Sequence, residues 1–191
     1  AFMTVILSSA LENARKVAPP DRPDLLLGHI NHFIKQTLGQ SHQSHQTSTS
    51  NDGCDATAMF IDRSEHRLFW AGARLSGFLL PAGGHEIVVL SADRMGVGYT
   101  ETPQDYCWTL HEMPLSPQDL LFIFTDGLTD QVGGARSIMF GKKRVKSLIE
   151  QHSSAPVAEL SAAMMEAYLG WQGNQQRRDD MTFLGFRYGG L

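Results

Sequence analysis

The order of the apolar segments along the chain is the feature that most limits its fold. Two stretches of helical spacing come first, short β-rich segments follow, two more helical stretches come next, and an apolar strand closes the sequence. Runs of strands followed by runs of helices favour an α+β domain with antiparallel sheets over an alternating βαβ fold. The segments predicted to form strands, separated by turn residues, are Ala56–Asp62, Arg67–Ala71, Gly77–Leu80, Glu86–Leu90, Trp108–His111, Leu120–Thr125 and Met181–Tyr188.

The helical stretches are recognised by apolar residues three and four positions apart. Near the N-terminus, Phe2, Val5 and Ile6 have this spacing, and a second helix is expected to begin after Pro23 and end at Gly39. The apolar residues of the second and of the two late helices are Leu26, Ile30, Phe33, Ile34 and Leu38, then Val145, Leu148 and Ile149, then Val157, Leu160, Met164 and Tyr168.

Residues 40–51 (QSHQSHQTSTSN) are all polar, so they cannot join a packed core, and we predict a mobile loop there. The rest of the chain has the composition of a globular protein, because 42% of its 191 residues are hydrophobic and 19% are charged. That length is typical of one domain with a core of its own. We therefore expect residues 1–191 to form a single domain.

Charge and cysteine usage exclude several classes of protein. The net charge is -4 and no basic stripe with interleaved aromatic residues occurs, so nucleic acid is not expected as a partner. Cys54 and Cys107 lie in apolar segments without C-x-x-C spacing, which favours buried free thiols in a reducing compartment. No apolar run has the length of a membrane span. We expect this segment to be cytoplasmic and to make no membrane contact.

The segment from Leu120 to Asp130 carries the clearest chemical signal. Five apolar residues, Leu120–Phe124, run directly into Thr125, Asp126 and Gly127, so a buried strand delivers a carboxylate to its end. A rigid strand fixes the direction of that carboxylate, and the glycine permits a sharp turn and close approach by a ligand. Asp130, four residues after Asp126, can face the same space.

A second acidic segment precedes the last strand. Asp179 and Asp180 lie just before the apolar residues 183–188, so two acidic strand ends can converge on one site. Mg²⁺ and Mn²⁺ prefer carboxylate, carbonyl and water oxygens, which these segments supply. Two simpler interpretations are that Asp126 belongs to an ordinary turn, and that the Asp pair forms a solvated ion-pair cluster with the preceding arginines, Arg177 and Arg178.

Together these motifs resemble the SpoIIE-like branch of the PPM-type metal-dependent serine/threonine protein phosphatases. The resemblance rests on Thr125–Leu128 with Asp130, and on Asp179–Thr182, in the order and separation of that family. Phe140-Gly141 and the Ala71–Ala73 segment match the family pattern more weakly.

The resemblance implies a β-sandwich of two antiparallel sheets flanked by helices, with a binuclear Mn²⁺ or Mg²⁺ site at one end. In the family pattern the two metal-binding aspartates correspond to Asp126 and Asp179. Asp180 corresponds to a position that more often supports a ligand than binds metal. Asp130 matches an acidic position near an additional metal.

The activity that the resemblance implies is removal of phosphate from a serine or threonine of a signalling protein. A metal pair lowers the pKa of bound water and neutralises phosphate charge, so no protein nucleophile is needed. In the SpoIIE-like branch the usual substrate is an anti-sigma-factor antagonist, which is therefore the implied partner class.

The family pattern also contains an acidic GGD-like motif and an Asp in a D-x-x-G-H-G loop, both ahead of the first helix. We therefore expect residues 1–191 to be the C-terminal portion of a phosphatase domain that lacks its first strands, within a larger protein that can be membrane-tethered. Alone, this portion is expected to be inactive or weakly active, and a homodimer would cover its open strand edges. The sequence Asp24–His29 (DLLLGH) mimics the loop, but it has one residue too many and lies in a helical pattern.

Two other classes of function are considered. A non-catalytic phosphatase-like module for binding or dimerisation is the main alternative, although such a scaffold is expected to lose its acidic strand ends, and Asp126 and Asp179 are present. A sensor domain for a small ligand has only generic support.

Two further motifs have simple explanations. The pairs His29/His32 and His42/His45 have a spacing that suits zinc, but they lack companion ligands nearby. Gly96-Val-Gly98 lacks the third glycine of a dinucleotide motif.

Overall fold

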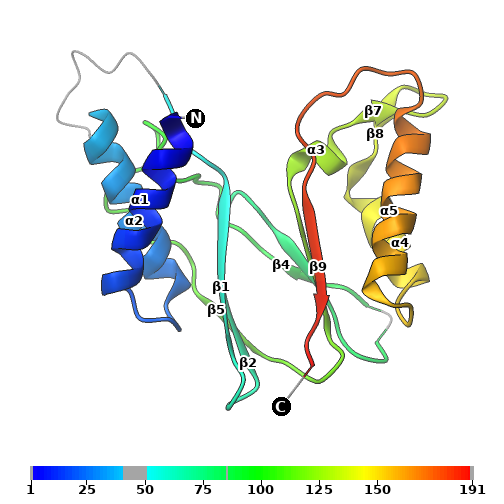
Figure 1. Ribbon diagram of the computed structural model, residues 1–191, viewed down its shortest axis with the longest axis horizontal. Coiled ribbons are helices and arrows are strands. Elements are labelled where there is room, and N and C mark those ends of the chain that lie inside the picture. The colour runs from blue at the N-terminus through cyan, green and yellow to red at the C-terminus, as the bar shows by residue number, and fades with distance from the viewer. Residues whose placement is uncertain (1, 41–50, 85, 190–191) are drawn as a thin grey trace. The chain divides into compact units, whose positions relative to one another are not determined.

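The computed structural model describes residues 2–40, 51–84 and 86–189 (Figure 1). The chain divides into two compact units, the first formed by Ala1–Ser76 with Ser91–Pro114 and the second by Gly77–Leu90 with Leu115–Leu191. Each unit combines helices with an antiparallel sheet, which confirms the predicted α+β class. The assignment of residues 1–191 to one domain stays a prediction.

The first unit contains two long helices and a three-stranded sheet. The helices are α1 (Phe2–Val17) and α2 (Pro23–Leu38), and they lie side by side next to the sheet (Figure 1). The strands β1 (Ala56–Asp62), β2 (Arg67–Ala73) and β5 (His111–Pro114) are ordered β1-β2-β5, with both pairs antiparallel.

The core of the first unit lies between the helices and the sheet. On α1 the buried positions recur every four residues, which is the spacing of one helical face. Phe2 and Val5 were predicted to share the face of Ile6, but both are exposed, because Phe2 is the first helical residue and Val5 points about 100° away from Ile6. The buried cluster contains Ile6, Ala10, Ala14, Leu27, Ile30, Ile34, Ala71, Ala73, Val97 and Trp108.

The second unit is built on a four-stranded antiparallel sheet. Its strands are β3 (Gly77–Leu80), β4 (Val88–Leu90), β6 (Leu120–Phe124) and β9 (Phe183–Arg187), in the order β4-β3-β6-β9. All five residues of β6 are buried, as expected for an apolar strand with neighbours on both sides. Asp119, just before β6, accepts the amide protons of two loop residues and so fixes the start of this strand.

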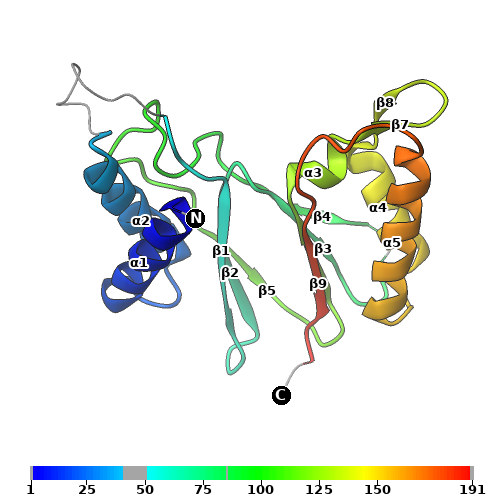
Figure 2. The same cartoon turned by 45° about the horizontal axis from the view of Figure 1, so that its top comes forward.

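Helices and a small hairpin complete the second unit. The helix α4 (Gly141–Gln151) packs beside α5 (Val157–Gln172) (Figure 2). The single-turn helix α3 (Asp126–Thr129) follows β6 directly, and a hairpin of two-residue strands, β7 (Val132–Gly133) and β8 (Ile138–Met139), follows α3. The buried cluster contains Phe78, Leu80, Ile87, Leu120, Phe122, Phe124, Leu128, Phe140, Val145, Ile149, Leu160, Met164 and Tyr168.

The strand predicted at Trp108–His111 was misplaced. The strand β5 begins only at His111, because the preceding residues bind a loop of the same unit instead of a sheet. The indole nitrogen of Trp108 donates to the carbonyl of Met95 at 3.0 Å, and the amide of Thr109 donates to Asp93 Oδ2 at 2.7 Å.

The predicted burial of both cysteines is correct only in part. Cys54 is half-buried and Cys107 is exposed, and both are free thiols. Burial raises the pKa of the Cys54 thiol to about 11, so this thiol stays protonated at neutral pH.

The first residue of the predicted 40–51 loop belongs to the core instead. Gln40 is buried, and its side-chain amide nitrogen donates to the carbonyls of Asp52 and Gly98 at 2.8 and 2.7 Å. Residues 41–50 lie outside the described residues. Within the described part of the chain, no helix combines the length and the apolar character that crossing a membrane requires.

Candidate metal centre

The two acidic segments, residues 125–130 and 179–182, lie at the same end of the second unit's sheet, where β6 ends and β9 begins. We call this end of the sheet the acidic edge. The strands β6 and β9 are antiparallel, and Phe124, the last residue of β6, is opposite Phe183, the first residue of β9. Asp126 follows the end of β6 and Asp179 precedes the start of β9, so the sheet register places both segments at one edge. Figure 2 shows α3, which begins with Asp126, at this end of the unit. Both aspartates are exposed.

Backbone contacts bind the two segments to each other. The amide of Thr125 donates to the carbonyl of Thr182 at 2.9 Å, and the amide of Thr182 donates back to Thr125 Oγ1 at 3.0 Å. The same hydroxyl lies 3.3 Å from the carbonyl oxygen of Asp180. Thr125, which directly precedes Asp126, therefore joins the first segment to Asp180 and Thr182 of the second, and the structure brings the two segments together as the sequence predicts.

Gly127 allows this close approach. A Cβ atom at Gly127 would lie 2.3 Å from the carbonyl oxygen of Asp180 and 3.2 Å from the Cα of Met181. Both neighbours are backbone atoms, so they cannot move aside by a change of rotamer. The sequence interpretation foresaw close approach by a ligand at this glycine, whereas the structure shows close approach by the second acidic segment.

The four predicted carboxylates differ in their hydrogen bonds. Asp179 Oδ1 accepts the amide proton of Asp180 at 2.7 Å, and Asp130 Oδ1 accepts the hydroxyl proton of Thr129 at 3.1 Å. The amide of Asp130 donates to the carbonyl of Asp126 at 2.8 Å, which holds these two residues in one turn. The Asp126 carboxylate has no hydrogen bond to the described part of the chain, so both of its oxygens can bind a ligand.

No cation of the described chain neutralises this acidic edge. Among residues 2–40, 51–84 and 86–189, the four ion pairs all lie in the first unit. Arg177 and Arg178 form no ion pair with Asp179 or Asp180, so the solvated ion-pair alternative is not what the structure shows. Uncompensated carboxylates at a strand edge suit a hard divalent cation.

The described residues supply only part of a ligand set. Within them, no group of three or more His, Cys, Asp or Glu side chains is arranged to hold a metal ion. The chemistry of the donors fits Mg²⁺ or Mn²⁺, but Asp126 and Asp179 leave most of the coordination to water or to other groups. The metal roles of these two residues, of Asp130 and of Asp180 stay predictions.

Gln131 is a residue of this site that the sequence interpretation missed. It is completely buried, and its amide nitrogen donates to the carbonyls of Val132 and Gln176 at 2.9 and 3.1 Å. Its amide oxygen accepts the Tyr168 hydroxyl proton at 3.2 Å and the Arg178 amide proton at 3.3 Å. Gln131 therefore joins the turn that carries Asp130 to the segment that precedes Asp179. No local pattern signals this role, since a glutamine after a turn is usually exposed.

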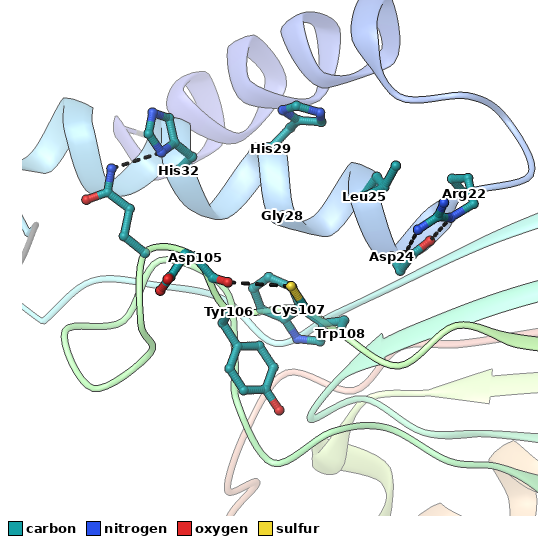
Figure 3. A pocket seen from close by; sticks show the side chains of 11 residues that line it. Arg22, Asp24, Leu25, Gly28, His29, His32, Asp105, Tyr106, Cys107 and Trp108 are labelled. Atoms are coloured by element: carbon teal, nitrogen blue, oxygen red, sulfur yellow. Dashed lines mark hydrogen bonds and ion pairs between the residues drawn. The ribbon is translucent and has the colours of Figure 1, made fainter.

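A groove of about 490 Å³ in the first unit contains the first histidine pair (Figure 3). His32 Nδ1 lies 2.9 Å from the side-chain nitrogen of Gln104, and the thiol of Cys107 donates to the Asp105 carbonyl at 3.6 Å. Among the described residues, neither His29 nor His32 belongs to a group of three or more His, Cys, Asp or Glu side chains arranged to hold a metal ion. His42 and His45 lie outside the described residues.

Two other sequence features have structural explanations. The DLLLGH stretch, residues 24–29, lies within α2 and is helical as predicted. Its first residue, Asp24, forms an ion pair with Arg22 at 2.6 Å. Gly96 and Gly98 are required by packing, because a Cβ atom would meet the Tyr99 ring at 2.5 Å from the first and the Ile34 side chain at 2.6 Å from the second.

Comparison with known proteins agrees with this fold. The sequence pattern of the family described as "Stage II sporulation protein E (SpoIIE)" matches residues 1–189. No curated protein matches the sequence. The SiaA-PP2C domain of Pseudomonas aeruginosa is similar at 27% identity with a TM-score of 0.84, and the match covers 98% of this chain and 70% of that one.

Two more distant structures share the fold. One contains the PP2C phosphatase domain and a fragment of the regulatory domain of SpoIIE from Bacillus subtilis, at 16% identity and a TM-score of 0.69, with coverage of 98% of this chain and 50% of that one. The other is RsbX in complex with magnesium, at 14% identity and a TM-score of 0.62, with coverage of 96% and 72%.

The family match over residues 1–189, together with the structural likeness to the SiaA-PP2C domain, identifies a phosphatase domain of the PPM type. The chain belongs to the SpoIIE family, which confirms the resemblance drawn from its motifs.

Proposed function

We propose that this protein is a metal-dependent protein serine/threonine phosphatase that acts in the cytoplasm on a phosphorylated signalling protein. The observation that carries the proposal is the junction of two exposed, uncompensated acidic segments in a member of the SpoIIE family. A magnesium complex of RsbX and a manganese-soaked form of the Bacillus subtilis SpoIIE phosphatase domain support a divalent ion as the cofactor.

Asp126 and Asp179 are the residues that would bind Mn²⁺ or Mg²⁺, with Asp130 and Asp180 beside them. A divalent ion in such a site lowers the pKa of bound water and neutralises phosphate charge. The chain's own contribution is to hold the ligands in place. Asp126 is held by β6 and the α3 turn. The residues on either side of Asp179 are held by two side chains, because the Asp180 carbonyl accepts from the Thr125 hydroxyl and the Arg178 amide donates to Gln131 Oε1. Such support matters, because misplaced ligands lose affinity and rate.

The family resemblance supports a proposal for the substrate class. An anti-sigma-factor antagonist phosphorylated on serine or threonine is the proposed partner.

The test is loss of activity on removing one ligand. In the full protein with saturating Mn²⁺, Asp126→Ala and Asp179→Ala are each expected to reduce hydrolysis of the phosphoprotein below about a tenth of wild type. The exposed helical variant Glu166→Ala is the matched control, because it removes an acidic side chain from α5 and leaves the acidic edge intact.

Bound metal and folding are measured on the same samples. Both Asp variants should lose metal yet keep cooperative unfolding, because removing one carboxylate relieves repulsion in the metal-free site. Unchanged activity and unchanged metal content in both variants would contradict the proposal. Binding of the phosphoprotein without any hydrolysis by wild type would instead favour the non-catalytic module.

A further inference from the structure

An open, polar groove of about 480 Å³ lies beside the candidate metal centre. It is lined by Val132 of β7 and by residues 175–178, which directly precede Asp179. Figure 2 shows the orange to red segment that leads from α5 past β7 and on toward α3, and this segment contains those groove residues. The groove therefore belongs to the second unit and adjoins the acidic edge.

The buried side chain of Gln131 fixes the backbone that lines this groove. Gln131 binds the carbonyl of Gln176 and the amide of Arg178, so the peptide groups on both sides of Arg177 are fixed. All the hydrogen-bonding capacity of the Gln131 amide is used, since it also binds Val132 and Tyr168. Arg177 and Arg178 thus extend from a positioned backbone, although they lie outside regular secondary structure.

The guanidinium groups of the two arginines have no partner in the described chain. Neither forms an ion pair or a side-chain hydrogen bond, even though Asp179 and Asp180 are adjacent in sequence. By contrast, Arg22, Arg74, Arg144 and Arg187 all bind carboxylates or carbonyls. Guanidinium groups offer fork-shaped donors that match carboxylates, so two free ones in one groove favour an anionic ligand.

We propose that Arg177 and Arg178 form a subsite for acidic side chains that flank the phosphorylated residue of the protein substrate. The inference rests on the proposed phosphatase function and adds a preference of substrate sequence to it. An extended peptide advances about 3.3–3.6 Å per residue. A substrate side chain bound by Arg177 or Arg178, one or two residues ahead of Asp179, therefore belongs to a near neighbour of the residue whose phosphate would reach a metal ion held by Asp126 and Asp179.

The experiment compares two fluorescein-labelled peptides with the full protein in Mn²⁺. Both carry a hydrolysis-resistant phosphonate in place of phosphoserine, and they differ only in having either two Glu or two Gln residues beside it. Wild type is expected to bind the Glu peptide about tenfold more tightly in fluorescence anisotropy at low salt, and Arg177→Ala/Arg178→Ala should reduce that preference below twofold. Because salt screens charges near the surface, the preference should also weaken in about 0.5 M NaCl.

The matched control is Lys142→Ala/Lys143→Ala, which removes the same charge from exposed positions of α4 that do not line the groove. This variant should keep the tenfold preference. Equal binding of both peptides by wild type, or an unchanged preference in the double Arg variant, would refute the subsite. If the Arg variant weakens both peptides equally, the arginines bind the phosphoryl group itself, and the acidic subsite is also refuted.

The binding assay needs no turnover, so it separates this inference from the function on which it rests. A protein that never hydrolyses phosphoprotein with Mn²⁺, yet prefers the Glu peptide through its arginines, would refute the phosphatase function and leave an acidic-peptide site. An active protein without the preference would refute only the subsite.

Discussion

Gly127 is the single residue on which the junction of the two acidic segments most directly depends. Its backbone conformation is ordinary, since its φ is not positive, so the requirement for glycine comes from space alone. A methyl group there would meet the backbone of Asp180 and Met181. Because Asp179 lies on the same segment, any movement that accommodates the methyl group also moves a predicted ligand.

Gly127→Ala is therefore expected to destabilise the protein by about 1–3 kcal/mol and to weaken metal-dependent activity, because overpacking against backbone forces a shift. Alanine favours helices over glycine by about 0.5–1 kcal/mol, which works against this loss in α3. Gly170→Ala on α5 is the control, since a methyl group there meets nothing within 4 Å and should stabilise the protein slightly. Urea unfolding of both variants measures the change in the free energy of unfolding. A Gly127→Ala protein as stable as wild type would show that the contact between Gly127 and the backbone of Asp180 is not tight.

At the residue scale, the sequence identified the acidic segments but not the residue that supports them. Asp126 and Asp179 could be found because each adjoins an apolar strand in a local motif. Gln131 could not, because its burial arises from α5 and from residues 176–178, which are distant in sequence. The exposure of Phe2 was likewise unpredictable from helical spacing, which gives the face of a residue but not where the partner surface ends.

At the scale of elements, the β7–β8 hairpin depends on one aromatic side chain of α5. Trp171 donates from its indole nitrogen to the Ile138 carbonyl at 3.1 Å, and its own carbonyl accepts the amide proton of Gly134 at 2.8 Å. The guanidinium of Arg144 stacks 3.7 Å from the centre of the indole ring. The hairpin begins directly after Gln131, and its first residue, Val132, lines the groove. A loosened hairpin would therefore also disturb the groove and the acidic edge beside it.

Trp171→Phe is expected to keep the apolar contact with Phe140 and to lose the indole hydrogen bond, at a cost of about 1 kcal/mol. A weaker interaction with Arg144 adds to this loss, since Trp is the best ring for cations. Amide hydrogen exchange should speed up in residues 132–139, while Leu169→Ala, an exposed change on the same helix, should leave it unchanged. Unaltered exchange in the Phe variant would show that the hairpin is held by other contacts.

The strands differ in how far the sequence could predict them. β1 and β3 have the predicted bounds, because each is a run of β-forming residues closed by turn residues. β7 and β8 were not predicted, since two-residue strands are too short to show an alternating pattern. β5 was displaced because the side chains of Trp108 and Asp93 make bonds that compete with strand pairing.

At the scale of the whole molecule, the candidate metal centre lies entirely in the second unit. Its four carboxylates lie in the two segments that meet where β6 ends and β9 begins, so a bound cation would offset the repulsion between their like charges. Metal binding should therefore appear as a gain in stability that depends on ion concentration. The size of that gain depends on how many ligands the chain supplies.

We expect this 191-residue protein to bind Mn²⁺ weakly, with a Kd of about 1 mM, because two carboxylates leave most coordination sites to water. At about 10 mM Mn²⁺ such a site stabilises the fold by about 1.4 kcal/mol, which thermal unfolding can detect. Asp126→Ala and Asp179→Ala should each remove the gain, whereas Glu166→Ala should keep it. RsbX, which has been seen with magnesium, serves as the positive control in calorimetry and should bind more tightly. Micromolar Mn²⁺ binding that survives both Asp variants would mean that other side chains hold the ion, and the assignment of Asp126 and Asp179 as ligands would be wrong.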